Sequence, residues 1–356
     1  MKWCFFLFVV IAVVVAVDSV FLQNYGTCQH RCYTPSDYIK PCQCDSDCES
    51  FNNCCNDFWR LCRGSEIGLV VTQNELNTFA QQLWDSDDNR INSSLYTLNY
   101  QGNTTQNEET DMATDKFLTP VDGQLDALLS KANSTYALFI QLLDNYELNV
   151  HQSEHRPLVE IQEEDAFWAV ASQTRVMQLA AKFLLDNGFI KADPHAFRTV
   201  INEMWFEMYS HYSVQLKSHK NSGFEHIMIG EKSQNTHQNA HNVSNHIMGL
   251  NNWIQFYLLE KAETIDYHGY LSYLQDPPLV SIQFQWNDAM GRKKNFFVGT
   301  SPEFDMALYT VCGLVHPNKP CHVTINGQNI TIKATTSRYQ STLQLTGAAP
   351  SFTGSV

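Results

Sequence analysis

Hydrophobic residues recur at helical spacing in the chain that follows the cysteine-rich start. Residues Ala166–Leu185 carry apolar side chains every three or four positions, which predicts one amphipathic helix. Asp193 and Pro194 then provide a cap and a first-turn proline, so we expect a second helix that runs through Trp205–Tyr209. The first half of the large domain is therefore predicted to be helical.

Short runs of β-branched and aromatic residues replace this pattern in the second half. Asn326-Gly327 separates two of the runs, and this dipeptide favours the tight turn of a β-hairpin. The predicted strands are Ser281–Trp286, Asn295–Val298, Cys321–Ile325 and Ile330–Ala334. Helices followed by antiparallel strands predict an α+β domain over residues 68–348, with residues 88–119 as a polar loop.

The N-terminus carries the pattern of an export signal. Lys2 precedes an apolar run from Trp3 to Val17, which is shorter than the roughly 20 residues that span a bilayer. Small residues follow, as they do at a cleavage site. We therefore expect residues 1–17 to be a signal peptide and the mature protein to be secreted, extracellular and without a membrane span. An N-terminal membrane anchor is the alternative.

Residues 24–65 form a cysteine-rich segment that is too short to fold on a hydrophobic core. Eight of the 11 cysteines lie there, and a pair lies near the C-terminus. An even number of cysteines in an exported chain indicates disulfides, whereas a zinc site is the alternative. The cysteines expected in disulfides are Cys28, Cys32, Cys42, Cys44, Cys48, Cys54, Cys55, Cys62, Cys312 and Cys321.

Charge and glycosylation motifs describe the surface. The net charge is −14 at pH 7, which argues against non-specific affinity for long nucleic acids but leaves room for a local basic cleft. The Asn-x-Ser/Thr motifs are compatible with a glycoprotein. They lie at Asn92, Asn103, Asn133, Asn242 and Asn329.

The first eight cysteines have a recognisable spacing, which includes the runs Cys42–Asp45 and Cys54–Phe58. This spacing resembles a somatomedin B domain. The resemblance implies a knot of four bridges that acts as a spacer or binds an extracellular protein partner.

Several motifs recur through the large domain. They are Ser222–His226, Gly230–Lys232, Asn252–Tyr257, Asp266–Tyr270, Gln283–Trp286 and Gly299–Tyr309. Together they resemble the EndoU family of uridine-preferring endoribonucleases, over nearly all of residues 70–345. Secreted members of that family often carry somatomedin B domains in front.

The resemblance implies cleavage of single-stranded, uridine-containing RNA by attack of the ribose 2′-OH on the neighbouring phosphorus, which gives a 2′,3′-cyclic phosphate. A base removes the 2′ proton, an acid protonates the leaving 5′ oxygen, and a cation stabilises the phosphate. The family uses two histidines and a lysine in these roles, and a Thr and a Tyr near its C-terminus. Many members depend on manganese.

Carried over to this chain, the resemblance assigns the first histidine to His226 and the flanking acidic residues to Glu225 and Glu231. Those carboxylates would orient the ring or recruit the divalent ion. The second histidine precedes Asn-Trp in the family, and Asn251 stands at that position here. An asparagine exchanges no proton at neutral pH.

Two further family positions are replaced. An ungapped count back from Ser301 places Gly291 at the lysine position, and a small register shift would let Lys293 or Lys294 serve instead. The Thr-x-Tyr motif reads Thr342-Leu343-Gln344, so the threonine is retained and Gln344 replaces the tyrosine.

Three histidines lie between His226 and Asn251, at His237, His241 and His246. One of them, with His246 as the candidate, would restore the missing imidazole; solvated side chains or a loosely held metal are the alternatives. Loss of a general acid or base costs roughly 10²- to 10⁴-fold in rate. We therefore expect an incomplete catalytic site with weak or lost activity. The alternative is an inactive extracellular protein that binds RNA or protein through its cleft or its somatomedin B domain.

Overall fold

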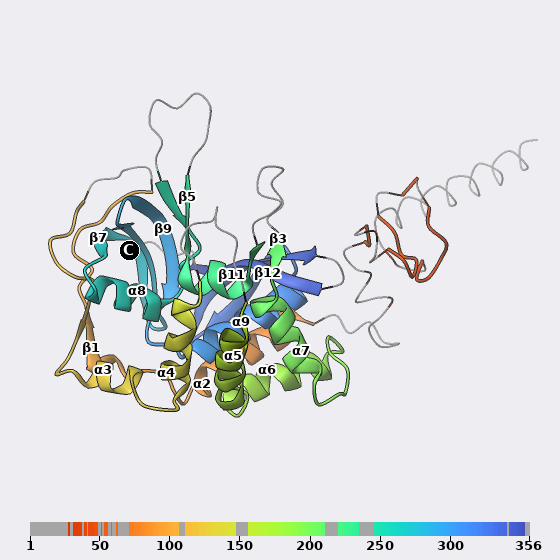
Figure 1. The fold of residues 1–356 in the computed structure, drawn as a ribbon, viewed down its shortest axis with the longest axis horizontal. Helices are drawn as coiled ribbons and strands as arrows, with labels where there is room; N and C mark the ends of the chain where they lie inside the picture. Colours follow the sequence, from red (N-terminus) through yellow and green to blue (C-terminus); the bar gives the residue numbers. More distant parts are fainter. Residues whose placement is uncertain are drawn as a thin grey trace, which may run out of the picture.

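The structure, a computed structural model, covers most of the large domain and part of the cysteine-rich segment (Figure 1). The signal peptide expected at residues 1–17 lies outside the described residues, as do His237, His241 and Asn242. Within the described part, no helix has the length and apolar character to cross a membrane. The described residues are 28, 31–37, 39–40, 42–48, 51, 53–55, 58, 62, 71–106, 111–146, 156–210, 220–234, 245–339 and 342–352.

The helical first half is confirmed, with different boundaries. In place of one helix over residues 166–185, the chain forms α5 (Leu158–Ala171) and α6 (Arg175–Asp186). The break is at Thr174, whose backbone is extended and whose hydroxyl donates to the carbonyl of Ala171 at 2.7 Å. Threonine side chains that bond to the local backbone in this way compete with helix continuation.

The second predicted helix begins and ends inside its expected bounds. Asp193 accepts a hydrogen bond from the amide of His195 at 2.7 Å, and α7 (Ala196–Ile201) follows and continues into the π-helical η4 (Asn202–Phe206). Tyr209 lies in the short strand β3 (Tyr209–Ser210) instead. The other helical elements are α2 (Gln73–Asp85), η2 (Ser93–Leu95), α3 (Gln124–Leu129), α4 (Thr135–Gln141), η3 (Leu142–Asp144), η5 (Glu225–Ile229), α8 (Trp253–Lys261) and α9 (Pro302–Val315).

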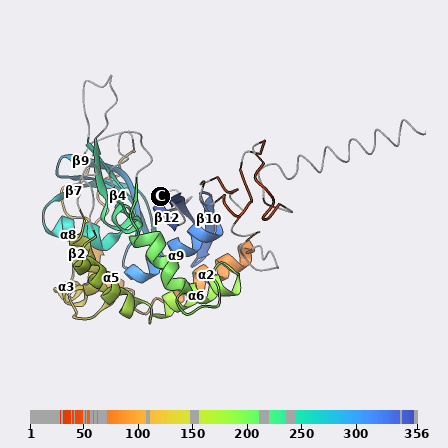
Figure 2. The same ribbon diagram turned by 45° about the vertical axis from the view of Figure 1, so that its right-hand side comes forward.

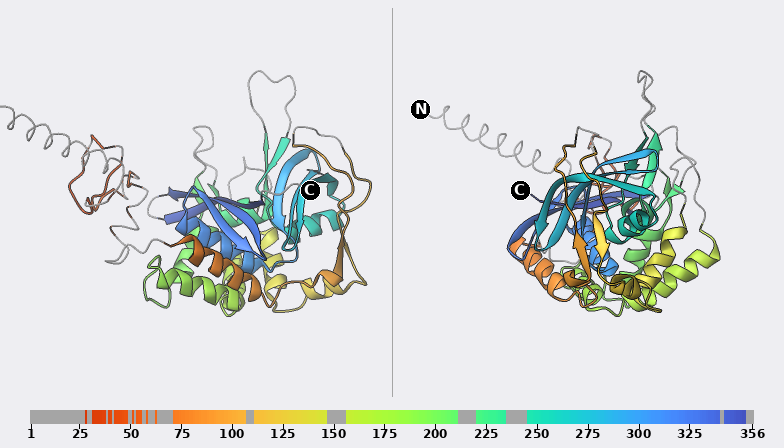
Figure 3. Two further views of the ribbon diagram at one scale, coloured as in Figure 1. Left: turned by 180° about the vertical axis from the view of Figure 1, so that it is seen from behind. Right: turned by 90° about the vertical axis from the view of Figure 1, so that its left-hand side faces the viewer.

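All four predicted strands are confirmed, three of them inside longer strands and Asn295–Val298 up to Phe297, where β9 ends, and two sheets carry them. One has the order β5-β6-β9-β8-β7 and the other β10-β11-β12 (Figures 1 and 3). Most neighbours are antiparallel, but β6 pairs in parallel with β9. The strands are β4 (Lys220–Asn221), β5 (Glu231–Gln234), β6 (Asn245–Met248), β7 (Ile265–Gln275), β8 (Pro278–Trp286), β9 (Ala289–Phe297), β10 (Pro320–Ile325), β11 (Gln328–Tyr339) and β12 (Thr342–Phe352).

Two local predictions have different outcomes. The turn at Asn326-Gly327 is confirmed, because both residues have positive φ angles of 49° and 75°, as a type I′ hairpin turn requires. The polar stretch 88–119 is only partly a loop, because β1 (Tyr96–Leu98) pairs with β2 (Leu118–Pro120) across it.

Helix α9 lies at the centre of the large domain, between α6 and the sheet that contains β11 (Figure 2). Its start follows the expected rule, because Ser301 accepts a hydrogen bond from the amide of Phe304 at 3.1 Å and a proline follows the cap. Every residue from Pro302 to Gly313 is buried. The core therefore forms around this helix, which packs against β10, β11 and β12 and contacts the end of β9 through Phe304 and Phe297.

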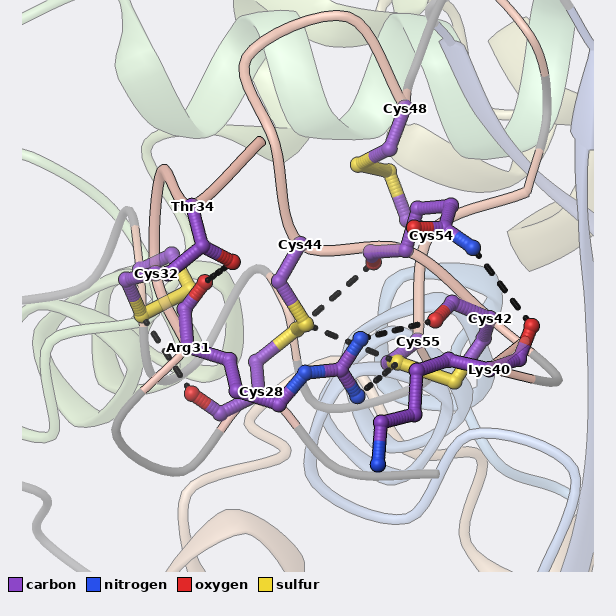
Figure 4. Close-up of a disulfide and its surroundings, with 12 residues drawn as sticks. Cys28, Arg31, Cys32, Thr34, Lys40, Cys42, Cys44, Cys48, Cys54 and Cys55 are labelled. Atoms are coloured by element: carbon purple, nitrogen blue, oxygen red, sulfur yellow. Dashed lines mark hydrogen bonds between the residues drawn. A yellow bond between two sulfur atoms is a disulfide. The ribbon is translucent and has the colours of Figure 1, made fainter. Parts of the chain in front are cut away.

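The cysteine-rich segment holds four disulfides, as expected (Figure 4). The zinc alternative is wrong, because all eight thiols are consumed in bridges. Arg31 fills the space between them and donates to the carbonyl of Cys42 at 3.2 Å. A fifth bridge, Cys312–Cys321, joins α9 to β10 in the large domain. The four bridges are Cys28–Cys44, Cys32–Cys62, Cys42–Cys55 and Cys48–Cys54.

Candidate active site

His226 lies on the π-helical turn η5, and the chain reverses directly after it. Ser222 starts the turn, since its hydroxyl accepts from the amide of Glu225 at 3.1 Å. Gly230 ends it with a φ of 90°, and a Cβ atom there would lie 2.6 Å from the Cβ of Leu250. Only glycine fits this position without strain. The reversal brings Glu231, the first residue of β5, back beside the imidazole.

His226 and Glu231 form the best-defined polar contact of the site. Nδ1 of His226 lies 2.6 Å from Oε2 of Glu231, and Oε1 of the same carboxylate accepts from Nδ2 of Asn221 at 2.6 Å. The Glu231 side chain is 1% exposed and the His226 side chain 16%. A carboxylate only accepts hydrogen bonds, so the proton of a neutral imidazole resides on Nδ1 and Nε2 is left as the basic atom. The Glu231 carboxylate thus fixes the orientation of the ring, and Glu225, which precedes His226 on η5, is buried.

Asn251 occupies the place beside this turn. Its backbone amide donates to the carbonyl of Ile227 at 2.8 Å, and the backbone amide of Leu250 donates to the carbonyl of His226 at 3.3 Å. The Asn251 side chain donates from Nδ2 to the carbonyl of Ala348 at 3.0 Å. The structure therefore brings together the two positions that the family pattern pairs, but the second offers an amide where an imidazole would exchange a proton.

The basic residues of β9 separate into an inward and an outward set. The pairing of β8 with β9 contains one extra β9 residue, because Phe284 pairs with Gly291 whereas Ile282 pairs with Lys294. The extra residue places Gly291 and Lys294 on the same buried face. Lys293 is exposed, so the predicted register shift favours Lys294 over Lys293.

Lys294 is a nearly buried cation. It is 8% exposed, and Nζ donates to the carbonyl of Ile247 at 2.6 Å. Burial lowers its pKa from the usual value to about 7. His246 lies on the adjoining strand, where burial and then the charges of Lys294 and Arg292 lower its pKa. Nδ1 of His246 is buried without a hydrogen-bond partner among the described residues.

The residue of β12 that lies near His226 is not the expected Thr342 but one further toward the C-terminus. Of Thr342 the structure describes only the backbone, which pairs with Tyr339 near the hairpin end, and Gln344 is fully buried. The residue that approaches the imidazole is Gly347, where a Cβ atom would lie 3.9 Å from Nε2 of His226. Thr346 precedes it and donates to the carbonyl of Thr335 at 3.3 Å. The sequence pattern did not predict that these residues lie near His226, although Thr346 is a second threonine in the same strand.

Manganese, which the resemblance implies, does not fit the residues around His226. Both oxygens of Glu231 already accept hydrogen bonds. Among the described residues, the groups of three or more side chains placed to share a metal ion include neither His226 nor Glu225 nor Glu231. We therefore derive no step of the chemistry through a metal at this site.

Comparison with known proteins decides the family. The model of the Endoribonuclease XendoU family matches residues 75–349, and the Somatomedin B domain model matches residues 26–65. The chain belongs to the XendoU family of endoribonucleases. The EndoU resemblance and the somatomedin B resemblance are thereby both confirmed.

Relatives within this family carry consistent names. The chain is 31% identical over 325 residues to the uridylate-specific endoribonuclease of Mus musculus, which covers 87% of this chain and 74% of the relative. It is 33% identical over 280 residues to uridylate-specific endoribonuclease D of Xenopus laevis, covering 76% and 85%. The solved structure of XendoU, described as a splicing-independent snoRNA processing endoribonuclease, matches with a TM-score of 0.63 and 27% identity. It covers 79% of this chain and 97% of that one.

Proposed function

We propose that this chain is a secreted uridylate-preferring endoribonuclease of reduced activity, in which His226 is the general base. The observation that carries the proposal is the 2.6 Å contact between His226 and Glu231, which fixes the ring with Nε2 as the basic atom. The names of the relatives support the choice of uridine-containing RNA as substrate. The somatomedin B domain and the five disulfides support secretion, and the four described Asn-x-Ser/Thr asparagines are exposed, as N-glycosylation requires.

In the proposed reaction, Nε2 of His226 removes the proton of the ribose 2′-OH. The 2′ oxygen forms a bond to phosphorus and the bond to the 5′ oxygen breaks, which leaves a 2′,3′-cyclic phosphate and a 5′-hydroxyl. We assign the phosphate cation to Lys294, since it shares the buried face of β9 with the family's lysine position. Asn251 donates a hydrogen bond but supplies no proton, so the leaving oxygen takes its proton from solvent. This missing acid is the reason for the reduced rate.

The second candidate function is an inactive protein that binds RNA in the same cleft. Two observations favour it: the side chain of Asn251 is held by the carbonyl of Ala348, and the Phe284 ring fills the space in front of Gly291. Such a protein would retain salt-sensitive RNA affinity without turnover. A protein partner of the somatomedin B domain belongs to this second candidate.

A cleavage assay distinguishes the two candidates. The secreted chain would be incubated with a fluorophore–quencher oligonucleotide that contains one uridine, beside His226→Ala and the matched control His322→Ala, an exposed histidine on β10. We expect slow cleavage by the wild type and the control, and a loss of at least about 10²-fold in His226→Ala. Equal cleavage by all three proteins would refute the role of His226. Absence of cleavage by folded wild type, with RNA binding retained, would establish the second candidate.

A further inference from the structure

A separate group of metal-ligating side chains lies at the other edge of the five-stranded sheet. Strand β5, which carries Glu231, is one edge of that sheet and β7 is the other. Asp266 and His268 lie on β7, and Asp111 comes from the segment that precedes β2. One potential ligand atom from each of the three side chains lies within 4.8 Å of the others.

The local backbone explains why the three residues meet. In the β7–β8 pairing Tyr267 is opposite Phe284 and Gly269 opposite Gln283, so His268 is an extra residue in the strand. Gly269 has a φ of 129°, and a Cβ atom there would lie 2.5 Å from the carbonyl oxygen of Gly102. Glycine thus permits the preceding segment to cross directly over β7. This crossing places Asp111 next to His268.

The crossing segment is fixed to β7 through the backbone. The amide of Met112 donates to the carbonyl of His268 at 2.9 Å, and the amide of Thr104 donates to Tyr270 at 2.8 Å. Oδ1 of Asp111 accepts from the amide of Ala113 at 2.9 Å, which orients the carboxylate. The group therefore rests on ordered backbone on both sides.

The buried imidazole of His268 distinguishes this group from an ordinary acidic cluster. It is 5% exposed, and its Nδ1 is buried with no hydrogen-bond partner among the described residues. Its Nε2 lies 3.6 Å from Oδ2 of Asp266, beyond hydrogen-bonding distance but close enough for an ion pair if the ring is protonated. A buried polar group without a partner is costly. The ring nevertheless faces two carboxylates, as a metal ligand would.

We propose that Asp111, Asp266 and His268 bind one divalent ion of the manganese or zinc type. One imidazole nitrogen and two carboxylate oxygens suit these ions, whereas calcium and magnesium prefer sites made of oxygen alone. The two carboxylates balance the charge of the ion. Ligands about 2.1 Å from a tetrahedral ion are about 3.4 Å apart; the three candidate ligand atoms lie within 4.8 Å of one another, and the two aspartates are exposed.

The ion would fasten the chain at Asp111 to β7. This role is structural, because the three residues lie on the edge strand opposite the one that carries Glu231. The proposal does not depend on the proposed ribonuclease function. It also offers a place for a divalent ion in a chain whose residues around His226 do not fit one.

Calorimetric titration of the secreted, EDTA-treated chain with Mn²⁺ and with Zn²⁺ tests the site. The variants are Asp111→Asn, His268→Gln and the matched control Asp115→Asn, an exposed aspartate of the same segment outside the group. We expect the wild type and the control to bind one ion more per chain than the first two variants. Because every variant keeps His237, His241 and His246, any ion bound by these histidines cancels in the comparison.

Thermal unfolding gives the second readout. At an ion concentration of about 100 Kd the Tm of the wild type should rise by about 5 °C, and that of folded Asp111→Asn should not. Asp111 is exposed, so its substitution leaves the apo fold intact and keeps the test valid if His268→Gln misfolds. Equal stoichiometry and equal Tm shifts in wild type and Asp111→Asn would overturn the proposal.

Discussion

The ring of Phe284 occupies the space directly in front of Gly291: a Cβ atom at position 291 would lie 2.9 Å from two of its carbons. The two residues face each other across β8 and β9, and Phe284 is fully buried against Phe256 of α8. The position that an ungapped count assigns to the family's lysine is therefore closed by the core of the sheet. Replacing the glycine alone does not rebuild the family site.

Substitution of Gly291 should consequently cost stability. We expect Gly291→Lys to lower the free energy of unfolding by about 1–3 kcal/mol, because overpacking forces neighbouring side chains to shift. Urea unfolding measures this. Gly291→Ala should show part of the same loss, and Phe284→Leu combined with Gly291→Lys should recover stability relative to Gly291→Lys alone. A fully stable Gly291→Lys protein would show that the ring moves aside readily.

Asn251→His should raise cleavage of the uridine-containing oligonucleotide by about 10²-fold, because it adds a proton donor where the family has one. The position adjoins the His226 turn, and its present hydrogen bond to Ala348 shows that a donor is accommodated there. The gain should vanish in Asn251→His combined with His226→Ala. If folded Asn251→His gains nothing, the missing imidazole is not what limits the rate.

Lys294 should make stability rise with pH. Burial lowers its pKa from 10.5 to about 7, so between pH 7 and pH 10 the unfolded chain binds more protons than the folded one. The free energy of unfolding therefore increases with pH over this window through Lys294. In Lys294→Met the increase from pH 7 to pH 10 should be smaller by on the order of 4 kcal/mol. Denaturant unfolding at both pH values measures it.

The exposed neighbour Lys293 supplies the matched control for that experiment. Lys293→Met should keep the pH dependence of the wild type, because the side chain is exposed. Titration of all other groups is shared by the proteins and cancels in the difference. Parallel pH profiles of Lys294→Met and wild type would mean that Lys294 retains an ordinary pKa.

Glu303, in contrast to Lys294, should make the free energy of unfolding fall as pH rises. Burial, with a contribution from the charge of Asp87, raises its pKa to about 7, although Asn89 and Thr135 donate hydrogen bonds to it. Between pH 4.5 and pH 7 the folded chain binds more protons than the unfolded one, so stability falls as pH rises. In Glu303→Gln this fall should be smaller by about 3 kcal/mol.

Unfolding of Glu303→Gln at pH 4.5 and pH 7 checks this prediction. The exposed Glu263→Gln serves as control and should follow the wild type. An unchanged pH dependence in Glu303→Gln would show that the buried carboxyl titrates normally.

The elements that the sequence predicted well have local causes. The Asn326-Gly327 hairpin follows from the two positive φ angles that its turn requires, and the start of α9 follows from Ser301 and Pro302. The single helix predicted over residues 166–185 was wrong, because the apolar spacing persists across Thr174 whereas the backbone does not. Apolar periodicity describes which residues are buried but does not detect a local cap that interrupts a helix.

At the candidate site the sequence placed His226, Glu231 and Asn251 in the correct neighbourhood, since short segments carry them. The sequence did not show which residue of β12 lies next to His226. That residue depends on the register between β11 and β12, which shifts between Thr335 and Thr336. Nor did it predict that Lys294 faces inward, since one extra residue in β9 reverses the alternation of side chains.

The sequence by itself thus determined the family, the number of disulfides and the fold class, because these depend on residue types and their spacing. The tertiary structure alone decided that Glu231 holds His226, that Phe284 closes the lysine position, and that Asp111 meets His268 across β7. Those contacts join residues whose proximity is set by strand register, bulges and segment crossings. Such long-range pairings are fixed only when the whole core packs, so no local pattern records them.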